Sequence, residues 1–89
     1  MRKFTELVSV GKETEKDFYD LGIETVEQLA KQDHVELYQR LCELKSTKVD
    51  ICCQDVFQAA ILQAKDPNCP KEQKQWWYWS RVRKANMVN

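Results

Sequence analysis

The segment over residues 49–65 constrains the fold of this chain more than any other stretch. Its apolar residues wrap most of the circumference of a helix. They leave a narrow polar strip, which consists of Asp50, Gln54 and Gln58. A helix that is apolar on most sides must be covered by other elements, because those sides avoid water. Asp66 and Pro67 end the segment, since proline disfavours a helical residue before it and cannot continue the hydrogen-bond ladder. We therefore predict a buried central helix over residues 48–65.

Helical patterns also precede the central segment. One helical face over residues 12–21 is marked, at i, i+4 and i+7, by Thr14, Phe18 and Leu21. Thr25 and Gln28 have the spacing of a capping box, so a short helix is expected to begin there. Asp33 is suited to cap the helix that follows.

The composition fits one small globular domain. The chain has 89 residues, of which 43% are hydrophobic and 31% are charged, so it is too apolar for a disordered segment. It is long enough to bury a modest core. No period-two alternation typical of strands appears. We predict an all-α protein, a compact single domain of five to six helices over residues 3–82, with a short basic tail over residues 83–89.

Both glycines of the chain lie in its first quarter. Gly11 ends a short corner made by Val8, Ser9 and Val10. Gly22 follows the next predicted helix and has the pattern of a helix stop, with Ile23 as its hydrophobic anchor. Helix, corner, helix and glycine stop together predict a helix-hairpin-helix (SAM-like) unit over residues 4–31. Units of this kind commonly lie on nucleic-acid backbones.

The corner and the helix after it offer candidate phosphate contacts, because the amides and dipole of a helix N-terminus attract anions. The candidate nucleic-acid-binding residues are Ser9, Val10, Gly11, Lys12, Thr14 and Lys16. The local charge opposes strong binding, since residues 12–36 hold three lysines and eight acidic residues. Nothing here predicts readout of base edges. We expect weak, sequence-independent binding, for which DNA is the expected partner.

A tryptophan-rich helix over residues 70–80 is predicted to close the fold, and Pro70 is suited to its first position. Four successive aromatic residues span the circumference of a helix, so they cannot all face one core. Trp76 and Trp79, at i and i+3, are expected to dock on the central helix. A second candidate patch, able to stack bases or anchor a protein, consists of Trp77, Tyr78, Arg81, Arg83 and Lys84.

The remaining chemistry-bearing residues predict no reaction. Three of the four cysteines fall within apolar helical patterns, and no signal peptide is visible. We therefore expect free thiols that pack as small hydrophobes in a cytoplasmic protein. There is no CxxC pair and only one histidine, His34, so we expect neither a metal nor another cofactor. We expect no enzymatic activity, no small-molecule substrate and no membrane span.

The chain resembles the small bacterial family called pathogenicity locus, or Cdd1, from about Leu7 to Arg81. The motifs that carry the resemblance are LGIxTVExL at residues 21–29, ELYQRLC at residues 36–42, VDxC at residues 49–52 and WWxW at residues 76–79. The resemblance implies a helix-hairpin-helix fold and a nucleic-acid role rather than a reaction.

The corner departs from the usual DNA-binding hairpin of this type. Val8 replaces a proline, Ser9 replaces the first glycine, and Glu15 replaces a small residue. A missing glycine stiffens the corner, and Glu15 adds a like charge near the path of a phosphate. The alternative interpretation is therefore a protein-interaction module. Its acidic hairpin face or its exposed aromatic residues would contact another protein or a second copy of the chain.

Overall fold

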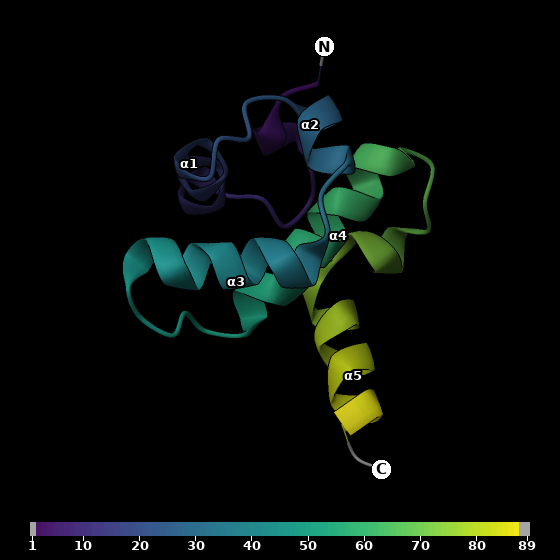
Figure 1. Cartoon of the computed structure of the whole chain (residues 1–89). Coiled ribbons are helices and arrows are strands. Elements are labelled where there is room, and N and C mark those ends of the chain that lie inside the picture. The colour runs from purple at the N-terminus through teal and green to yellow at the C-terminus, as the bar shows by residue number, and fades with distance from the viewer. Residues whose placement is uncertain (1, 88–89) are drawn as a thin grey trace.

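The computed structural model describes residues 2–87 and shows a chain built from helices (Figure 1). The elements are, in order, η1 (Phe4–Glu6), α1 (Lys12–Asp20), α2 (Val26–Ala30), α3 (His34–Lys45), α4 (Cys52–Lys65), η2 (Lys71–Lys74) and α5 (Trp76–Met87), where η marks a short 3-10 helix. No strand occurs within residues 2–87. The prediction of an all-α, single-domain fold is confirmed.

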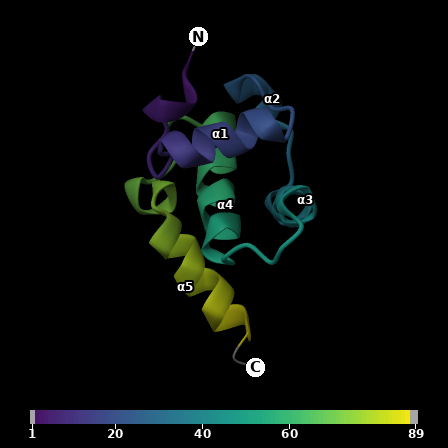
Figure 2. The ribbon, with the colours of Figure 1, turned by 90° about the vertical axis from the view of Figure 1, so that its left-hand side faces the viewer.

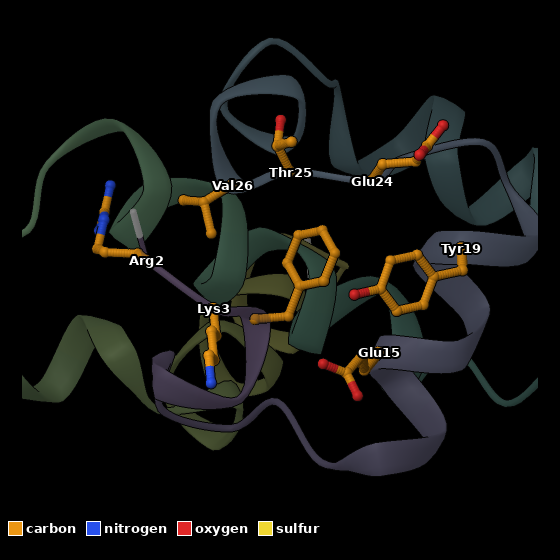
Figure 3. Close-up of a pocket in the computed structure, with 8 residues that line it drawn as sticks. Arg2, Lys3, Glu15, Tyr19, Glu24, Thr25 and Val26 are labelled. Atoms are coloured by element: carbon orange, nitrogen blue, oxygen red, sulfur yellow. The ribbon is translucent and has the colours of Figure 1, made fainter.

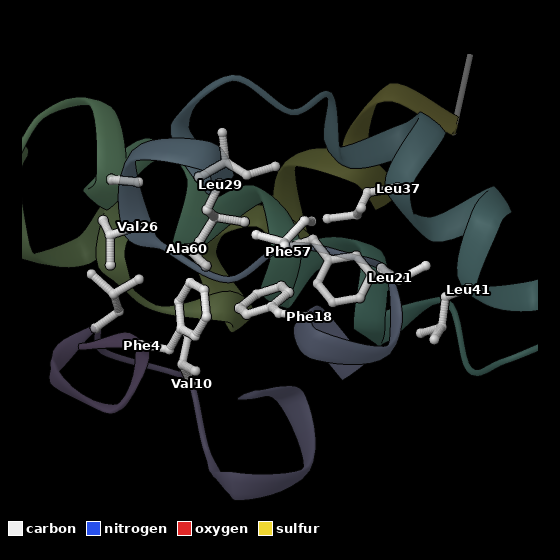
Figure 4. Packing of buried hydrophobic residues seen from close by; sticks show 14 of the residues in the cluster. Phe4, Val10, Phe18, Leu21, Val26, Leu29, Leu37, Leu41, Phe57 and Ala60 are labelled. Carbon is white, nitrogen blue, oxygen red and sulfur yellow. The ribbon is translucent and has the colours of Figure 1, made fainter. Parts of the chain in front are cut away.

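The helix α4 lies at the centre of the molecule, with α1 and α2 near one end, α3 on one side and α5 on another (Figures 1 and 2). Phe18 of α1 and Phe57 of α4 meet in the core with ring centroids 5.5 Å apart. Around them lie fully buried leucines from α2 and α3 (Figure 4). The central helix is therefore placed as predicted. It begins later than expected, at Cys52, because the Asp50 carboxylate accepts a hydrogen bond from the Cys52 amide.

The predicted end of α1 and the predicted starts of α2 and α3 are confirmed. Gly22 has a φ of +83°, and the Ile23 amide donates to the Phe18 carbonyl oxygen at 2.8 Å, which closes α1 in a Schellman motif. The Thr25 hydroxyl accepts from the Gln28 amide at 3.1 Å, as a capping box requires. The helix expected before the corner, at the start of the unit over residues 4–31, is only the single turn η1.

The predicted closing helix and tail differ from the structure. The segment over residues 70–80 is two elements, η2 and α5, and the helix α5 continues to Met87. The predicted basic tail over residues 83–89 is therefore helical as far as Met87, while residues 88–89 lie outside the described residues. The break has a physical reason. The Lys74 carbonyl oxygen accepts hydrogen bonds from the Ser9 hydroxyl at 3.0 Å and the Gln63 amide at 3.4 Å, which takes it out of a continuous helical ladder.

Candidate nucleic-acid interface

Ser9 joins the predicted hairpin corner to the start of α5. Its φ of +74° lies in the left-handed region, which glycine would occupy without strain. Its hydroxyl donates to the Lys74 carbonyl oxygen at 3.0 Å and accepts from the Trp76 amide at 3.1 Å. Ser9 therefore caps the first turn of α5 from a distant part of the chain, and its side chain is engaged within the protein.

The buried side chain of Gln63 holds the same corner against α4. Its Oε1 accepts from the Val8 amide at 2.9 Å, and its Nε2 donates to the Val8 carbonyl oxygen at 2.9 Å. Gln63 is only 4% exposed. The corner is thus fixed on two sides, by Gln63 of α4 and by the start of α5. This role of Gln63 was not predicted from the sequence.

The other predicted phosphate contacts lie at the N-terminus of α1. Gly11 is the N-cap and supplies no side-chain cap, and Lys12 is exposed in the first turn. Thr14 is half-buried. The exposed Lys16 forms an ion pair of 3.1 Å with Asp20. Val10 is buried, and its amide donates to the Leu7 carbonyl oxygen at 3.3 Å, so the amides offered to a ligand here are those of the first turn of α1.

One acidic residue of α1 is compensated by a distant base. Asp17 pairs with Lys45 of α3 at 3.2 Å. The hydrogen bond to the Asp17 carboxylate and its charge raise the pKa of Lys45 above its ordinary value. Asp17 and Asp20 thus each have a lysine partner, which reduces the effective negative charge around α1.

The four aromatic residues at the start of α5 divide into two pairs. Trp79 is half-buried, its indole Nε1 donates to the Gln73 carbonyl oxygen at 2.7 Å, and its ring meets Tyr78 edge to face. Trp76 and Trp77 keep 39% and 40% of their surface exposed. Of the two residues predicted to dock on α4, only Trp79 packs inward. The prediction that Trp76 docks is wrong.

Of the predicted basic residues, Arg81 and Lys84 are exposed, whereas Arg83 is engaged inside the fold. The guanidinium carbon of Arg81 lies 4.9 Å from the centroid of the Trp77 ring, which is a cation–π contact. Arg83 forms a bidentate pair with Asp55 of α4, with Nε and Nη2 at 3.0–3.2 Å from the carboxylate oxygens. Asp55 is 1% exposed. The hydrogen bond to the Asp55 carboxylate raises the pKa of Arg83. This buried pair joins α5 to α4.

The two predicted patches are neighbours in the structure. The corner between η1 and α1 lies against η2 and the beginning of α5 (Figure 2). The N-terminus of α1 therefore lies near the start of α5, where Trp76 and Trp77 are exposed. From residue 73 to the end, the sequence holds no acidic residue.

A separate cleft of about 350 Å³ opens between the N-terminal segment, α1 and α2 (Figure 3). The side chains of Glu15 and Tyr19 point into the same space. Phe4 also lines the cleft, and its ring centroid lies 5.5 Å from that of Tyr19. Arg2, at its edge, donates to the carbonyl oxygens of Gln63 and Ala64 at the end of α4, both at 2.8 Å. These contacts tie the N-terminal segment to α4, and the lining residues do not assemble a nucleophile with a base.

Cys52 and Cys53 lack the environment of reactive thiols. Cys42, Cys52, Cys53 and Cys69 are all free. Burial is the main cause that raises the pKa of the thiols of Cys52 and Cys53. The part of the chain that the structure describes contains no group of three or more His, Cys, Asp or Glu side chains placed to hold a metal ion. Nor does any helix in that part have the length and apolar character to cross a membrane.

The structure is thus a small all-helical domain. We call the exposed aromatic and basic residues of α5 its aromatic and basic face; they are Trp76, Trp77, Arg81 and Lys84. The chain belongs to the pathogenicity locus (Cdd1) family, whose model matches residues 1–85. It is also similar to the mitomycin resistance protein McrB of Streptomyces lavendulae, with 35% identity over 81 residues that cover 90% of this chain and 72% of that protein. No solved structure is significantly similar.

Proposed function

We propose that this chain is a non-enzymatic module of the helix-hairpin-helix type that binds nucleic acid weakly and without sequence preference. The contacts of Ser9 with Lys74 and Trp76 support this most, because they bring the N-terminus of α1 beside the start of α5, the helix that carries Arg81 and Lys84. The first turn of α1 would offer backbone amides to one phosphate. Arg81 and Lys84 would attract others along α5.

The charges around this region favour weak rather than firm binding. Residues 12–36 carry eight acidic residues and only three lysines. This excess of negative charge repels a polyanion. From residue 71 onward there are five basic residues against Glu72 alone. A phosphate backbone would therefore approach from the side of α5.

Fluorescence anisotropy with a labelled duplex and a labelled single strand across a salt series tests the proposal. Two double variants separate the patches, Lys12→Ala with Lys16→Ala and Arg81→Ala with Lys84→Ala. On the duplex, each lost phosphate contact should flatten the log–log salt dependence by about 0.9, so losing two contacts should flatten it by about 1.8.

A matched control removes two exposed lysines that belong to neither patch, Lys31→Ala with Lys65→Ala. The control should keep the wild-type affinity and salt dependence. The proposal is wrong if the wild-type chain binds nothing at low salt, or if both test variants behave like the control.

The name of the similar Streptomyces lavendulae protein suggests a cellular readout for the same proposal. Mitomycin-sensitive bacteria that express this chain should survive the drug better than bacteria with an empty vector. If nucleic-acid binding underlies protection, the Arg81→Ala with Lys84→Ala variant should protect less at equal expression. Equal protection by the wild-type chain and this variant would show that drug protection does not depend on nucleic-acid binding by Arg81 and Lys84.

A protein-interaction module is the second candidate, and the exposure of Val8, Trp76 and Trp77 favours it. These side chains add apolar surface to the aromatic and basic face, as protein contacts often require. Light scattering tests self-association directly. A concentration-dependent dimer that the Trp77→Ser variant abolishes would support this function over nucleic-acid binding.

A further inference from the structure

We infer that the nucleic acid bound by this face carries unpaired bases, and that one of them stacks on the indole of Trp77. This inference rests on the proposed function and names the class of nucleic acid that the face selects. Trp77 lies in the first turn of α5 and is 40% exposed. The faces of paired bases are covered by their neighbours in a duplex, so only an unpaired base can stack on an exposed indole.

Arg81 prepares Trp77 for this role. It lies one helical turn after Trp77, and its guanidinium carbon is 4.9 Å from the ring centroid. The contact restrains the indole before a ligand arrives, which lowers the entropy lost on binding. The guanidinium occupies one face of the ring, so a base would stack on the opposite face. The same cation would attract the phosphate of the stacked nucleotide.

The charge along α5 favours a polyanion as the occupant. Trp77, Arg81 and Lys84 follow one another at i, i+4 and i+7, so they form one stripe about 10 Å long. Arg81 and Lys84 are both exposed. No acidic residue lies in this helix, so nothing along it repels a polyanion. A protein partner would need acidic residues opposite Arg81 and Lys84 and also a surface that fits Trp77.

The other aromatic residues of α5 are less suited to stacking. The indole of Trp79 is held by its hydrogen bond to the Gln73 carbonyl oxygen, and its ring packs on Tyr78. Trp76 is exposed, and its backbone is fixed at the corner by Ser9. Trp77 is thus the residue whose substitution tests the inference.

Anisotropy with three labelled ligands of equal length provides the test. The ligands are an oligothymidylate strand, the same strand with abasic sites in place of its bases, and a fully paired duplex. We expect the oligothymidylate to bind about tenfold more tightly than the abasic strand. Trp77→Ala should remove most of that difference without changing the salt dependence, because it removes no charge.

Three further variants control for charge and folding. Trp77→Phe should keep part of the affinity, and Arg81→Lys should weaken stacking while keeping its charge. Tyr19→Ala removes an aromatic residue, 51% exposed, from the acidic helix α1 and should change nothing. Circular dichroism confirms that each variant is folded. Quenching of tryptophan fluorescence by oligothymidylate, lost in Trp77→Phe, gives a readout independent of affinity.

The outcomes separate the inference from the function on which it rests. If duplex, abasic and oligothymidylate ligands bind equally and Trp77→Ala affects them alike, the stacking inference is overturned while nucleic-acid binding stands. If no ligand binds at low salt, both are overturned.

Discussion

Replacing Gln63 with leucine should destabilise the fold by about 2–3 kcal/mol, although leucine is similar in size and more apolar. The side chain of Gln63 makes two hydrogen bonds of 2.9 Å, one to the amide and one to the carbonyl oxygen of Val8. It also donates to the Ala59 carbonyl oxygen at 3.2 Å. That oxygen is an acceptor within α4 as well, so the main loss falls on the two backbone groups of Val8.

The size of the effect follows from those two groups. A buried backbone group left without a partner costs about 1–3 kcal/mol. Both bonds to Val8 are only partly buried, so water can reach the groups to some extent. The lower end of that range, about 1–1.5 kcal/mol for each group, therefore applies. For a domain of this size the loss corresponds to a melting temperature about 10–20 °C lower.

Thermal unfolding followed by circular dichroism measures this change, with Gln58→Leu as the control. Gln58 lies on the same helix, is half-buried and belongs to the polar strip, so its substitution should change the free energy of unfolding by no more than about 0.5 kcal/mol. Hydrogen exchange of the Val8 amide should also accelerate in Gln63→Leu. Equal melting temperatures for the two variants, or unchanged protection of Val8, would refute the role assigned to Gln63.

Three other substitutions and conditions test the remaining contacts. Ser9→Ala should lower the free energy of unfolding in urea by about 1–2 kcal/mol, because α5 loses its cap. Ser9→Gly should lower it by less, since glycine relieves the strain of the positive φ. The reverse order would contradict this role of Ser9. Asp55→Asn should cost about 3 kcal/mol by breaking the buried pair, and Asp55→Leu combined with Arg83→Met should recover much of it; no recovery would argue against the pair as the cause. In the folded state, burial raises the pKa of Tyr38, and the Asp17 carboxylate raises the pKa of Lys45. Both groups therefore contribute fully to folding stability below about pH 10, and this contribution is lost as the pH rises through their folded-state pKa values. The urea midpoint should therefore fall from pH 9 to 12, less steeply in Tyr38→Phe, and an unchanged slope in that variant would contradict the assignment.

Signals that act within a few residues were predictable from the sequence. Gly22, Thr25 and Asp33 each satisfy backbone groups next to them in the chain, so their residue types and spacing are sufficient to place the helix ends. The apolar circumference of the central segment likewise required its position at the centre of the fold.

Contacts between distant segments left weaker signals. Ser9 and Trp76 are 67 residues apart, and Val8 and Gln63 are 55 apart, so no local spacing connects them. One sign was present. Asp55 and Gln63 are polar residues that lie off the polar strip of an otherwise apolar helix, and such residues need buried partners. That pattern identifies both residues as polar connections, but it cannot name their partners.

The pair between Asp55 and Arg83 also explains why the basic residues of α5 act differently. Residues i and i+2 of an α-helix, such as Arg81 and Arg83, point in directions about 200° apart around its axis. Since the buried Asp55 holds Arg83 against α4, Arg81 must point to nearly the opposite side, where it is exposed. Trp77, one turn before Arg81, is then directed to the same outer stripe, where its ring meets the guanidinium. The aromatic and basic stripe therefore depends on the buried ion pair. Asp55→Asn should weaken binding of oligothymidylate wherever it loosens α5, even in molecules that remain folded.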